Sequence, residues 1–151
     1  MNTASSALSA YGNTPKRSLS SLEGVHPDLV KVVKRAIELT ECDFTITEGL
    51  RSKERQAQLL KEKKTTTSNS RHLTGHAVDL AAWVVPEGTE KATVSWEWKY
   101  YYQIADAMKK AASELNVSIE WGGDWKKFKD GPHFQLTWGP RDFASIYCKN
   151  L

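Results

Sequence analysis

Residues 70–79 read Ser-Arg-His-Leu-Thr-Gly-His-Ala-Val-Asp, and this stretch decides the expected fold. Gly75 marks a turn, because glycine enters the left-handed backbone region at no steric cost. The chain that follows, 77–83, is almost entirely apolar, which predicts a largely buried strand. A glycine turn that leads into a strand can bring the imidazole of His72 and the carboxylate of Asp79 to one point.

Helical and strand patterns mix on both sides of this stretch, without a strict βαβ repeat. The fold class that we expect is α+β: a small mixed or antiparallel sheet with helices packed on one side, and a functional site at the sheet edge or in a groove. Periodicity and capping residues predict helices from Pro27, from Ser52 to about Lys63, and over 100–115. The strands expected beside 77–83 are 43–48, 117–121 and 133–138, and residues 84–97 are expected to form an irregular insertion.

The chain has 151 residues, which is the size of one globular domain. Residues 1–24 have a turn-forming composition and are expected to form a flexible arm, and residues 25–151 a single domain. The two cysteines, Cys42 and Cys148, are too few for a disulfide framework, so we expect both to be reduced and structural.

Composition excludes several partners. The formal net charge is +3, and the basic residues are scattered, so we expect no nucleic acid. The N-terminal residues lack the basic and apolar regions of a secretory signal, and no run is long enough to cross a bilayer. We therefore expect synthesis in the cytoplasm without membrane insertion, and a separate release factor if the substrate lies outside the inner membrane.

His133 opens the last predicted strand and could supply a third ligand beside His72 and Asp79. Two histidines and one carboxylate match a catalytic zinc site that leaves one position open to water. The alternative pair, His72 and His76, has the spacing of a zincin helix, but Thr74 and Gly75 make that segment a poor helix, and a leucine stands where the zincin glutamate belongs. His76 is then expected to lie next to the ligands or in a groove. The alternative without a metal is that His72 is simply a hydrogen-bonded histidine next to a glycine turn.

Three separated motifs carry a family resemblance: Glu-Gly-Leu-Arg at 48–51, Ser-x-His-x-x-Gly-x-Ala-x-Asp at 70–79, and Trp-Gly-Gly-Asp-Trp at 121–125 followed by Asp-Gly-Pro-His-Phe at 130–134. Together they resemble the zinc peptidase family that contains D-alanyl-D-alanine carboxypeptidases, the vancomycin-resistance dipeptidase and phage L-alanyl-D-glutamate endopeptidases. The chain looks most similar to the phage endolysin branch.

The resemblance implies roles for individual residues. His72, Asp79 and His133 match the ligands of Zn²⁺. Asp130 matches the general base and acid, although the carboxypeptidase and dipeptidase branches usually carry glutamate there. Arg51 matches a cationic residue that holds the substrate carbonyl or the developing oxyanion.

Other residues are assigned less directly. Ser70 matches a position near the substrate or behind the ligands. Asp124 competes with Asp130 for the role of base, but after two glycines it is more typical of a turn cap. Trp96 and Trp98, in the predicted insertion, are the tryptophans expected to face substrate, together with His76.

The function expected from the resemblance is that of an endolysin. Such an enzyme cleaves the L-alanyl-D-glutamate bond of peptidoglycan during phage-induced lysis, acts as a monomer, and depends on a holin-type partner for release to the wall. Two alternatives stay open: a D,D-carboxypeptidase or dipeptidase of wall metabolism, and a non-catalytic, zinc-stabilised binding module. An intact Asp130 argues against the binding module.

Overall fold

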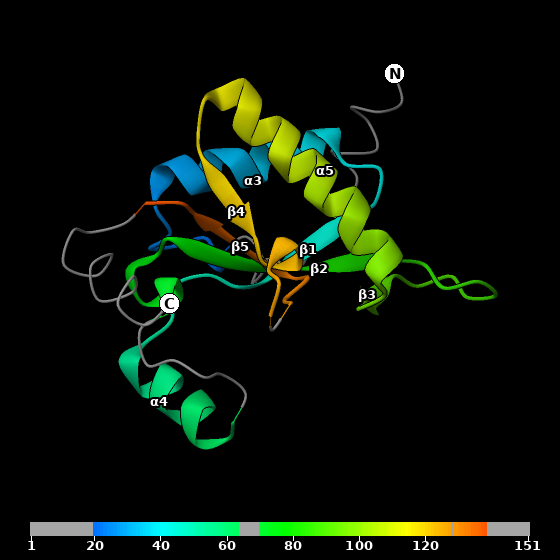
Figure 1. Cartoon of the computed structure of the whole chain (residues 1–151). Helices are drawn as coiled ribbons and strands as arrows, with labels where there is room; N and C mark the ends of the chain where they lie inside the picture. The colour runs from blue at the N-terminus through cyan, green and yellow to red at the C-terminus, as the bar shows by residue number, and fades with distance from the viewer. Residues whose placement is uncertain (1–19, 64–69, 128, 139–151) are drawn as a thin grey trace.

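The computed structural model describes residues 20–63, 70–127 and 129–138. Five antiparallel strands form one sheet: β1 (Phe44–Glu48), β2 (Ala77–Val84), β3 (Thr93–Ser95), β4 (Ile119–Trp121) and β5 (His133–Leu136). The strand order is β1-β2-β5-β4, and β3 pairs with β2 beyond this path (Figure 1). The predicted α+β class is confirmed, and the sheet is antiparallel.

Two helices, α3 (Pro27–Leu39) and α5 (Trp98–Leu115), cover one face of the sheet, as predicted. The short α4 (Lys53–Lys61) lies on the opposite side, below the sheet in Figure 1. Two 3-10 turns complete the described elements, Arg71–Thr74 before β2 and Gly122–Asp124 after β4. The face of the sheet away from α3 and α5 is therefore free to carry polar side chains.

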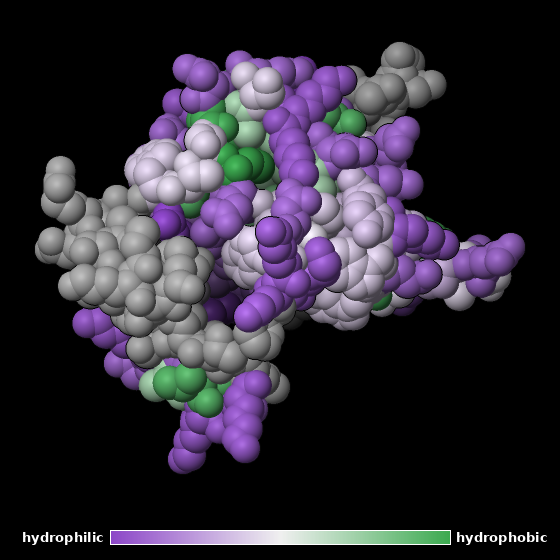
Figure 2. Space-filling view, in the orientation of Figure 1, coloured by the Kyte–Doolittle hydropathy of each residue, from purple (hydrophilic) through white to green (hydrophobic). Residues whose placement is uncertain are grey.

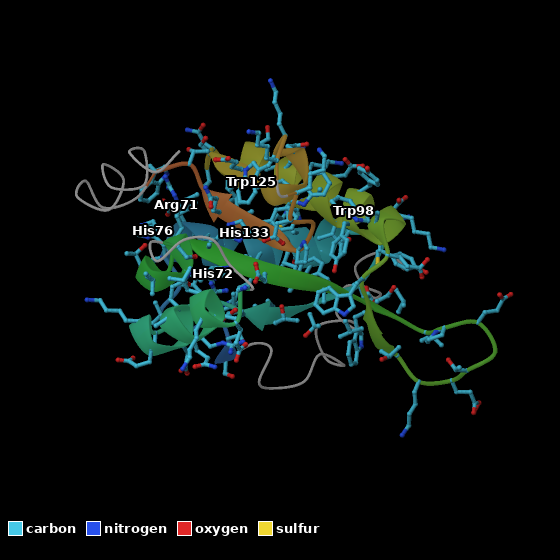
Figure 3. All side chains as sticks on the ribbon, turned by 60° about the horizontal axis from the view of Figure 1, so that its bottom comes forward. Arg71, His72, His76, Trp98, Trp125 and His133 are labelled. Atoms are coloured by element: carbon cyan, nitrogen blue, oxygen red, sulfur yellow. The ribbon has the colours of Figure 1, made fainter. Side chains whose placement is uncertain are left out.

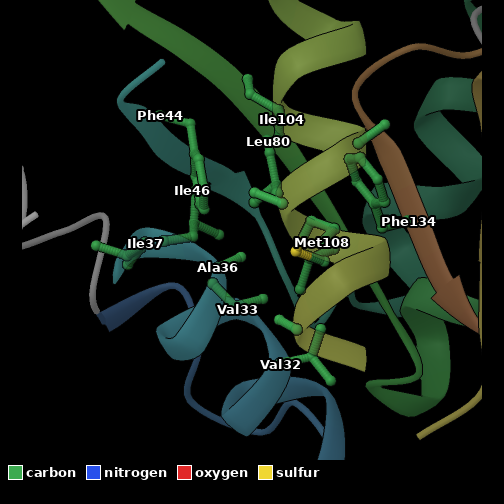
Figure 4. Close-up of a cluster of buried hydrophobic side chains, with 14 of the residues drawn as sticks. Val32, Val33, Ala36, Ile37, Phe44, Ile46, Leu80, Ile104, Met108 and Phe134 are labelled. Atoms are coloured by element: carbon green, nitrogen blue, oxygen red, sulfur yellow. The ribbon is translucent and has the colours of Figure 1, made fainter. Parts of the chain in front are cut away.

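The hydrophobic core fills the space between α3, α5 and the sheet (Figure 4). Its members come from the apolar face of each helix and from the inward positions of β1, β2 and β5, and the largest fully buried ones include Leu29, Leu80, Tyr101, Ile104, Met108, Phe134 and Leu136. This packing holds β2 and β5 rigidly side by side, and it therefore fixes the positions of the side chains on the opposite face of these strands.

Local sequence sets the helix ends. Pro27 stands in the first turn of α3, and the His26 side chain accepts a hydrogen bond from the Asp28 backbone N–H. Ser52 caps α4 by accepting from the Arg55 N–H at 3.0 Å, as its position before the helix predicted. The start of α3 is also joined to the turn before β2, because the His26 N–H donates to the Gly75 carbonyl at 2.8 Å.

Two regions differ in detail from the sequence expectations. The predicted irregular insertion contains β3, which continues the sheet from the far end of β2. Within the predicted arm, residues 1–19 lie outside the described residues, but Leu22 is buried in the core.

In the part of the chain that the structure describes, no helix has both the length and the apolar character needed to span a bilayer.

Candidate metal centre and active site

Strand register brings two of the predicted ligands together. Asp79 in β2 lies opposite His133 in β5, so their side chains emerge side by side on the same face of the sheet. His72 arrives from the 3-10 turn that precedes β2. That turn closes through Gly75, whose φ of 77° places it in the left-handed region, and a Cβ there would lie 2.2 Å from the carbonyl oxygen of Gly24. Only glycine fits this position without strain.

The three side chains converge on one point. The Asp79 Oδ1 lies 3.2 Å from Nε2 of His72 and 3.3 Å from Nδ1 of His133. One ligand atom from each residue falls within 4.8 Å of the others. Among the described residues, this is the cluster of His, Cys, Asp and Glu side chains that could hold a metal ion. The structure thus brings together the predicted ligand set, whereas His76 lies outside it.

The outer nitrogens of both histidines are already engaged. His72 Nδ1 lies 2.8 Å from the Gly49 carbonyl oxygen, so this nitrogen carries the hydrogen and donates it. His133 Nε2 lies 2.8 Å from Oε1 of Gln135. The opposite ring nitrogens, Nε2 of His72 and Nδ1 of His133, both face Asp79 and are the atoms that would bind a metal ion. Hydrogen bonds of this kind orient histidine ligands in metal sites, so the donor set fits a bound metal ion.

Charge at the site favours a cation. Burial alone would raise the pKa of Asp79, but the hydrogen bonds and charges of His133 and His72 outweigh it and hold that pKa well below its usual range. Burial lowers the pKa of His133, and the Asp79 carboxylate more than reverses this, so the net shift is upwards. Asp79 thus stays ionised and attracts positive charge to the point where the three ligands meet.

Asp130 stands half-buried on the loop that leads into β5. Its backbone N–H donates to Gly122 at 3.0 Å, and its carbonyl accepts from the His133 N–H at 3.2 Å, so the loop is fixed to both neighbours. Burial raises the pKa of Asp130, and the charge of Asp79 raises it further, while His133 and other cations oppose this. A carboxyl with a raised pKa beside a metal-ligand set is suited to take and return a proton.

Arg51 reaches the site from the segment between β1 and α4, and its side chain is buried. Its guanidinium donates to Glu48 through Nε at 3.0 Å and Nη2 at 2.6 Å, and to Gln56 through Nη1 at 2.8 Å. Nη2 also lies 3.8 Å from Oδ2 of Asp79. The ion pair with Glu48 thus holds the Arg51 guanidinium next to a metal ligand.

Ser70 and His76 have different surroundings. Ser70 is buried and caps the 3-10 turn, accepting from the His72 N–H at 3.1 Å, so it lies directly behind a ligand. His76 donates to or accepts from Thr74 Oγ1 at 2.8 Å and packs against the rings of His26 and Trp138. Burial lowers the pKa of His76, and His26 adds to this effect.

Trp96 and Trp98 lie at the start of α5, with 57% and 41% of their surfaces exposed. In Figure 3, His72 and His133 lie together over the sheet, and Trp98 lies on the side away from His76.

Asp124 is exposed at the end of the Gly122–Asp124 turn, and its carboxylate forms a surface ion pair with Lys109 at 2.8 Å.

Three residues around His133 were not predicted from the sequence. Gln135 accepts from His133, its amide lies 3.4 Å from Glu120, and Glu120 accepts from the Trp125 indole at 2.6 Å. The one available signal was the two-residue strand period, which places Gln135 on the same face of β5 as His133. The contacts with Glu120 and Trp125 depend on the pairing between β4 and β5, which cannot be read from the sequence.

An antiparallel sheet that presents a His-Asp-His donor set beside a half-buried acid defines a metallopeptidase site. Comparisons with known proteins narrow the class. The chain belongs to the phage L-alanyl-D-glutamate peptidase family, whose model matches residues 13–137.

Individual relatives agree with this family. The chain is 31% identical to the L-alanyl-D-glutamate peptidase of Escherichia phage T5 over 135 residues, which cover 87% of this chain and 93% of that protein. It is 29% identical to the peptidoglycan L-alanyl-D-glutamate endopeptidase CwlK of Bacillus subtilis over 129 residues, which cover 78% and 74% of the two chains. The crystal structure of the Serratia marcescens L-Ala D-Glu endopeptidase ChiX matches with a TM-score of 0.72 and 51% identity, covering 85% of this chain and 90% of that one.

Proposed function

We propose that this protein is a zinc endopeptidase that hydrolyses the L-alanyl-D-glutamate bond of peptidoglycan stem peptides. The observation that carries the proposal is the convergence of His72, Asp79 and His133 within 4.8 Å, beside Asp130, in a member of the L-alanyl-D-glutamate peptidase family. Two histidines and a carboxylate form a ligand set typical of catalytic zinc, which leaves a position for water.

The chain's own residues supply the remaining parts of the reaction. Zinc, when bound, polarises the scissile carbonyl and lowers the pKa of its water. Asp130 accepts a proton from the attacking water and returns it to the leaving amine of D-glutamate, for which its raised pKa is suited. Arg51, held beside Asp79 by Glu48, is placed to stabilise negative charge on the substrate oxygen.

Four residues complete the proposed site. Ser70 supports His72 from behind, and His76 lines the end of the groove near α3. Trp96 and Trp98 contact the substrate at the opposite end. In Figure 2, the coloured side chains at the hollow between the body of the protein and α4 are mostly hydrophilic, as a polar peptide substrate requires.

The biological role that fits this activity is host-cell lysis by a phage. The protein would be made in the host cytoplasm as a monomer and reach the wall after a holin-type partner permeabilises the membrane. The phage L-alanyl-D-glutamate peptidases among its relatives support this role.

Digestion of purified peptidoglycan, followed by mass spectrometry of the products, tests the proposal. Stem peptides with a new N-terminal D-glutamate are the expected products. Released D-alanine would instead identify a D,D-carboxypeptidase. No product from zinc-loaded protein would favour the binding module. Elemental analysis should find about one zinc per chain, and protein stripped of metal by a chelator should lose activity and regain it with zinc.

A further inference from the structure

An exposed aromatic surface lies at the start of α5. Trp96, Trp98 and Tyr102 are 57%, 41% and 58% exposed, and Trp121 is buried beneath them. The Trp98 ring centroid lies 6.0 Å from that of Tyr102 and 6.2 Å from that of Trp121. We call these four residues the aromatic surface. Figure 2 shows near-neutral hydropathy over the first turns of α5. Exposed aromatic groups gathered in this way mark a binding surface.

The aromatic surface is continuous with the active site. The Trp121 indole N–H donates to the Gly131 carbonyl at 2.7 Å. A Cβ on Gly131 would lie 3.5 Å from Cη2 of Trp98, so the Trp98 ring lies against this loop. Gly131 follows Asp130 directly and precedes the ligand His133 by two residues. Trp98 therefore lies next to the loop that carries Asp130, where it could contact a substrate group that extends past Asp130 on this side.

We infer that the aromatic surface binds the glycan strand of peptidoglycan at the muramic acid next to the reacting stem peptide. The inference rests on the proposed function. In peptidoglycan, L-alanine is attached directly to the lactyl group of muramic acid. At about 3.5 Å per extended residue, the sugar lies within roughly 10 Å of the L-alanyl-D-glutamate bond. An enzyme that cuts this bond in the intact wall must therefore accommodate a sugar beside its active site.

The chemical character of the aromatic surface suits the binding of a saccharide. The flat C–H faces of pyranose rings pack on aromatic rings, and Trp and Tyr combine a broad apolar face with a polar tip. At the edge of the surface, Lys109 Nζ lies 5.2 Å from the Trp121 ring centroid and 2.8 Å from Asp124 Oδ2. This edge offers both donors and acceptors to sugar hydroxyl and acetamido groups. An apolar floor with a few polar groups at its margin is typical of small-ligand sites.

Two substrates that differ only in the sugar test the inference. One is the disaccharide-tetrapeptide released from wall by a muramidase, and the other is the same tetrapeptide without sugar. For the zinc-loaded full-length enzyme, kcat/KM should be higher on the disaccharide-peptide. Tyr102→Ala, which removes the ring that packs against Trp98 and Trp121, should lower the ratio of the two kcat/KM values about three- to tenfold. Trp98→Ala should lower the ratio further.

Trp138→Ala is the matched control. Trp138 is 41% exposed like Trp98, but it packs against His26 and His76, away from the aromatic surface. This variant should keep the wild-type ratio. A free N-acetylglucosaminyl-N-acetylmuramic acid disaccharide should also shift the indole NMR signal of Trp98, identified by its loss in Trp98→Ala.

The outcomes separate the two levels of the proposal. If neither substrate yields N-terminal D-glutamate, the proposed function fails. If both are cut there, but the ratio is unchanged in Tyr102→Ala and Trp98→Ala, then the glycan inference alone is overturned. Equal losses on both substrates would show that the rings only support the Asp130 loop. A change in oligomeric state in these variants would assign the surface to self-association instead.

Discussion

His133 and Gln135 are joined by a contact of 2.8 Å between Nε2 and Oε1, on one face of the same strand. Gln135 Nε2 points towards Glu120 at 3.4 Å, which orients the amide so that its oxygen faces the histidine. The Trp125 ring lies against His133, with 5.2 Å between the ring centroids. His133 is thus held by its outer nitrogen and by one face, and Nδ1 is left to face Asp79.

Gln135→Met should weaken metal binding. Methionine keeps the approximate volume of glutamine but cannot accept the proton of His133 Nε2, so the ring is free to change tautomer and orientation. We expect zinc affinity to fall roughly 10- to 100-fold, measured by competition with a chromogenic chelator. Gln58→Met is the control, because the Gln58 side chain is exposed on α4 and donates to Glu62 at the end of that helix. Unchanged affinity in Gln135→Met would show that the contact does not orient the ligand.

Asp130→Asn should abolish most turnover and leave the metal in place. The amide is nearly isosteric but cannot accept a proton from water. We expect the rate to fall by about 10²- to 10⁴-fold, the usual contribution of a positioned proton-transfer group, with bound zinc and the thermal midpoint retained. If Asp130→Asn loses its zinc, Asp130 is a ligand and not the base.

Two further variants separate ligand, base and surface roles in the same assays. His133→Ala deletes a ligand, so zinc affinity should fall together with activity. Asp124→Asn removes a surface ion pair with Lys109 and should change the rate little. An inactive Asp124→Asn with intact zinc, beside an active Asp130→Asn, would transfer the role of base to Asp124.

Arg51→Lys tests the proposed role of the guanidinium in the reaction. Lysine keeps the charge but loses the forked geometry that meets Glu48. We expect kcat to fall about 100-fold, as when a transition-state donor is removed. Glu48→Gln keeps one oxygen for Arg51 and should cost less activity. Equal losses in kcat and equal falls in thermal midpoint for both variants would assign Arg51 to the ion pair alone.

Gly75→Ala should destabilise the fold and weaken the metal site together. The substitution imposes strain at φ 77° and places Cβ 2.2 Å from the Gly24 carbonyl oxygen, so the turn that carries His72 must shift. We expect a loss above the ~1 kcal/mol typical of backbone strain at such a glycine, measured by urea unfolding. Gly88→Ala is the control: φ is 81°, but no atom lies within 4 Å of its Cβ. Equal losses would show that the Gly24 contact relaxes freely.

Cys42 should be almost inert to alkylation in the folded protein. Burial raises its pKa to about 11, and the charge of Asp43 adds to this. At pH 8.5 about half of an unfolded cysteine is thiolate, so the reactive fraction falls roughly 100-fold on folding. Because folding favours the neutral thiol, this group should also reduce stability as the pH rises from about 8.5 to about 11. Mass spectrometry after iodoacetamide treatment, with and without urea, measures the difference. Equal rates would show that Cys42 is accessible.

Local sequence patterns predicted much of this fold. The apolar period after Pro27 predicted α3, and Ser52 predicted the start of α4. The motif spacing selected His72, Asp79 and His133, which the fold brings to one point. β3 was missed because its three residues are too short to show alternation and gain their order from β2. The sequence also did not determine which side chains contact Arg51 and His133, because those contacts depend on rotamers and strand pairing and not on spacing.

The pairing of Asp79 with His133 has a consequence for the order of events during synthesis. Ribosomes make proteins from the N-terminus, so β1, β2 and α5 emerge well before β5. Until residue 133 has left the ribosome and β5 has entered between β2 and β4, the nascent chain offers only two of the three ligands. Tight metal uptake therefore waits until β5 has been made and paired, and a product terminated before His133 would be released without its third ligand.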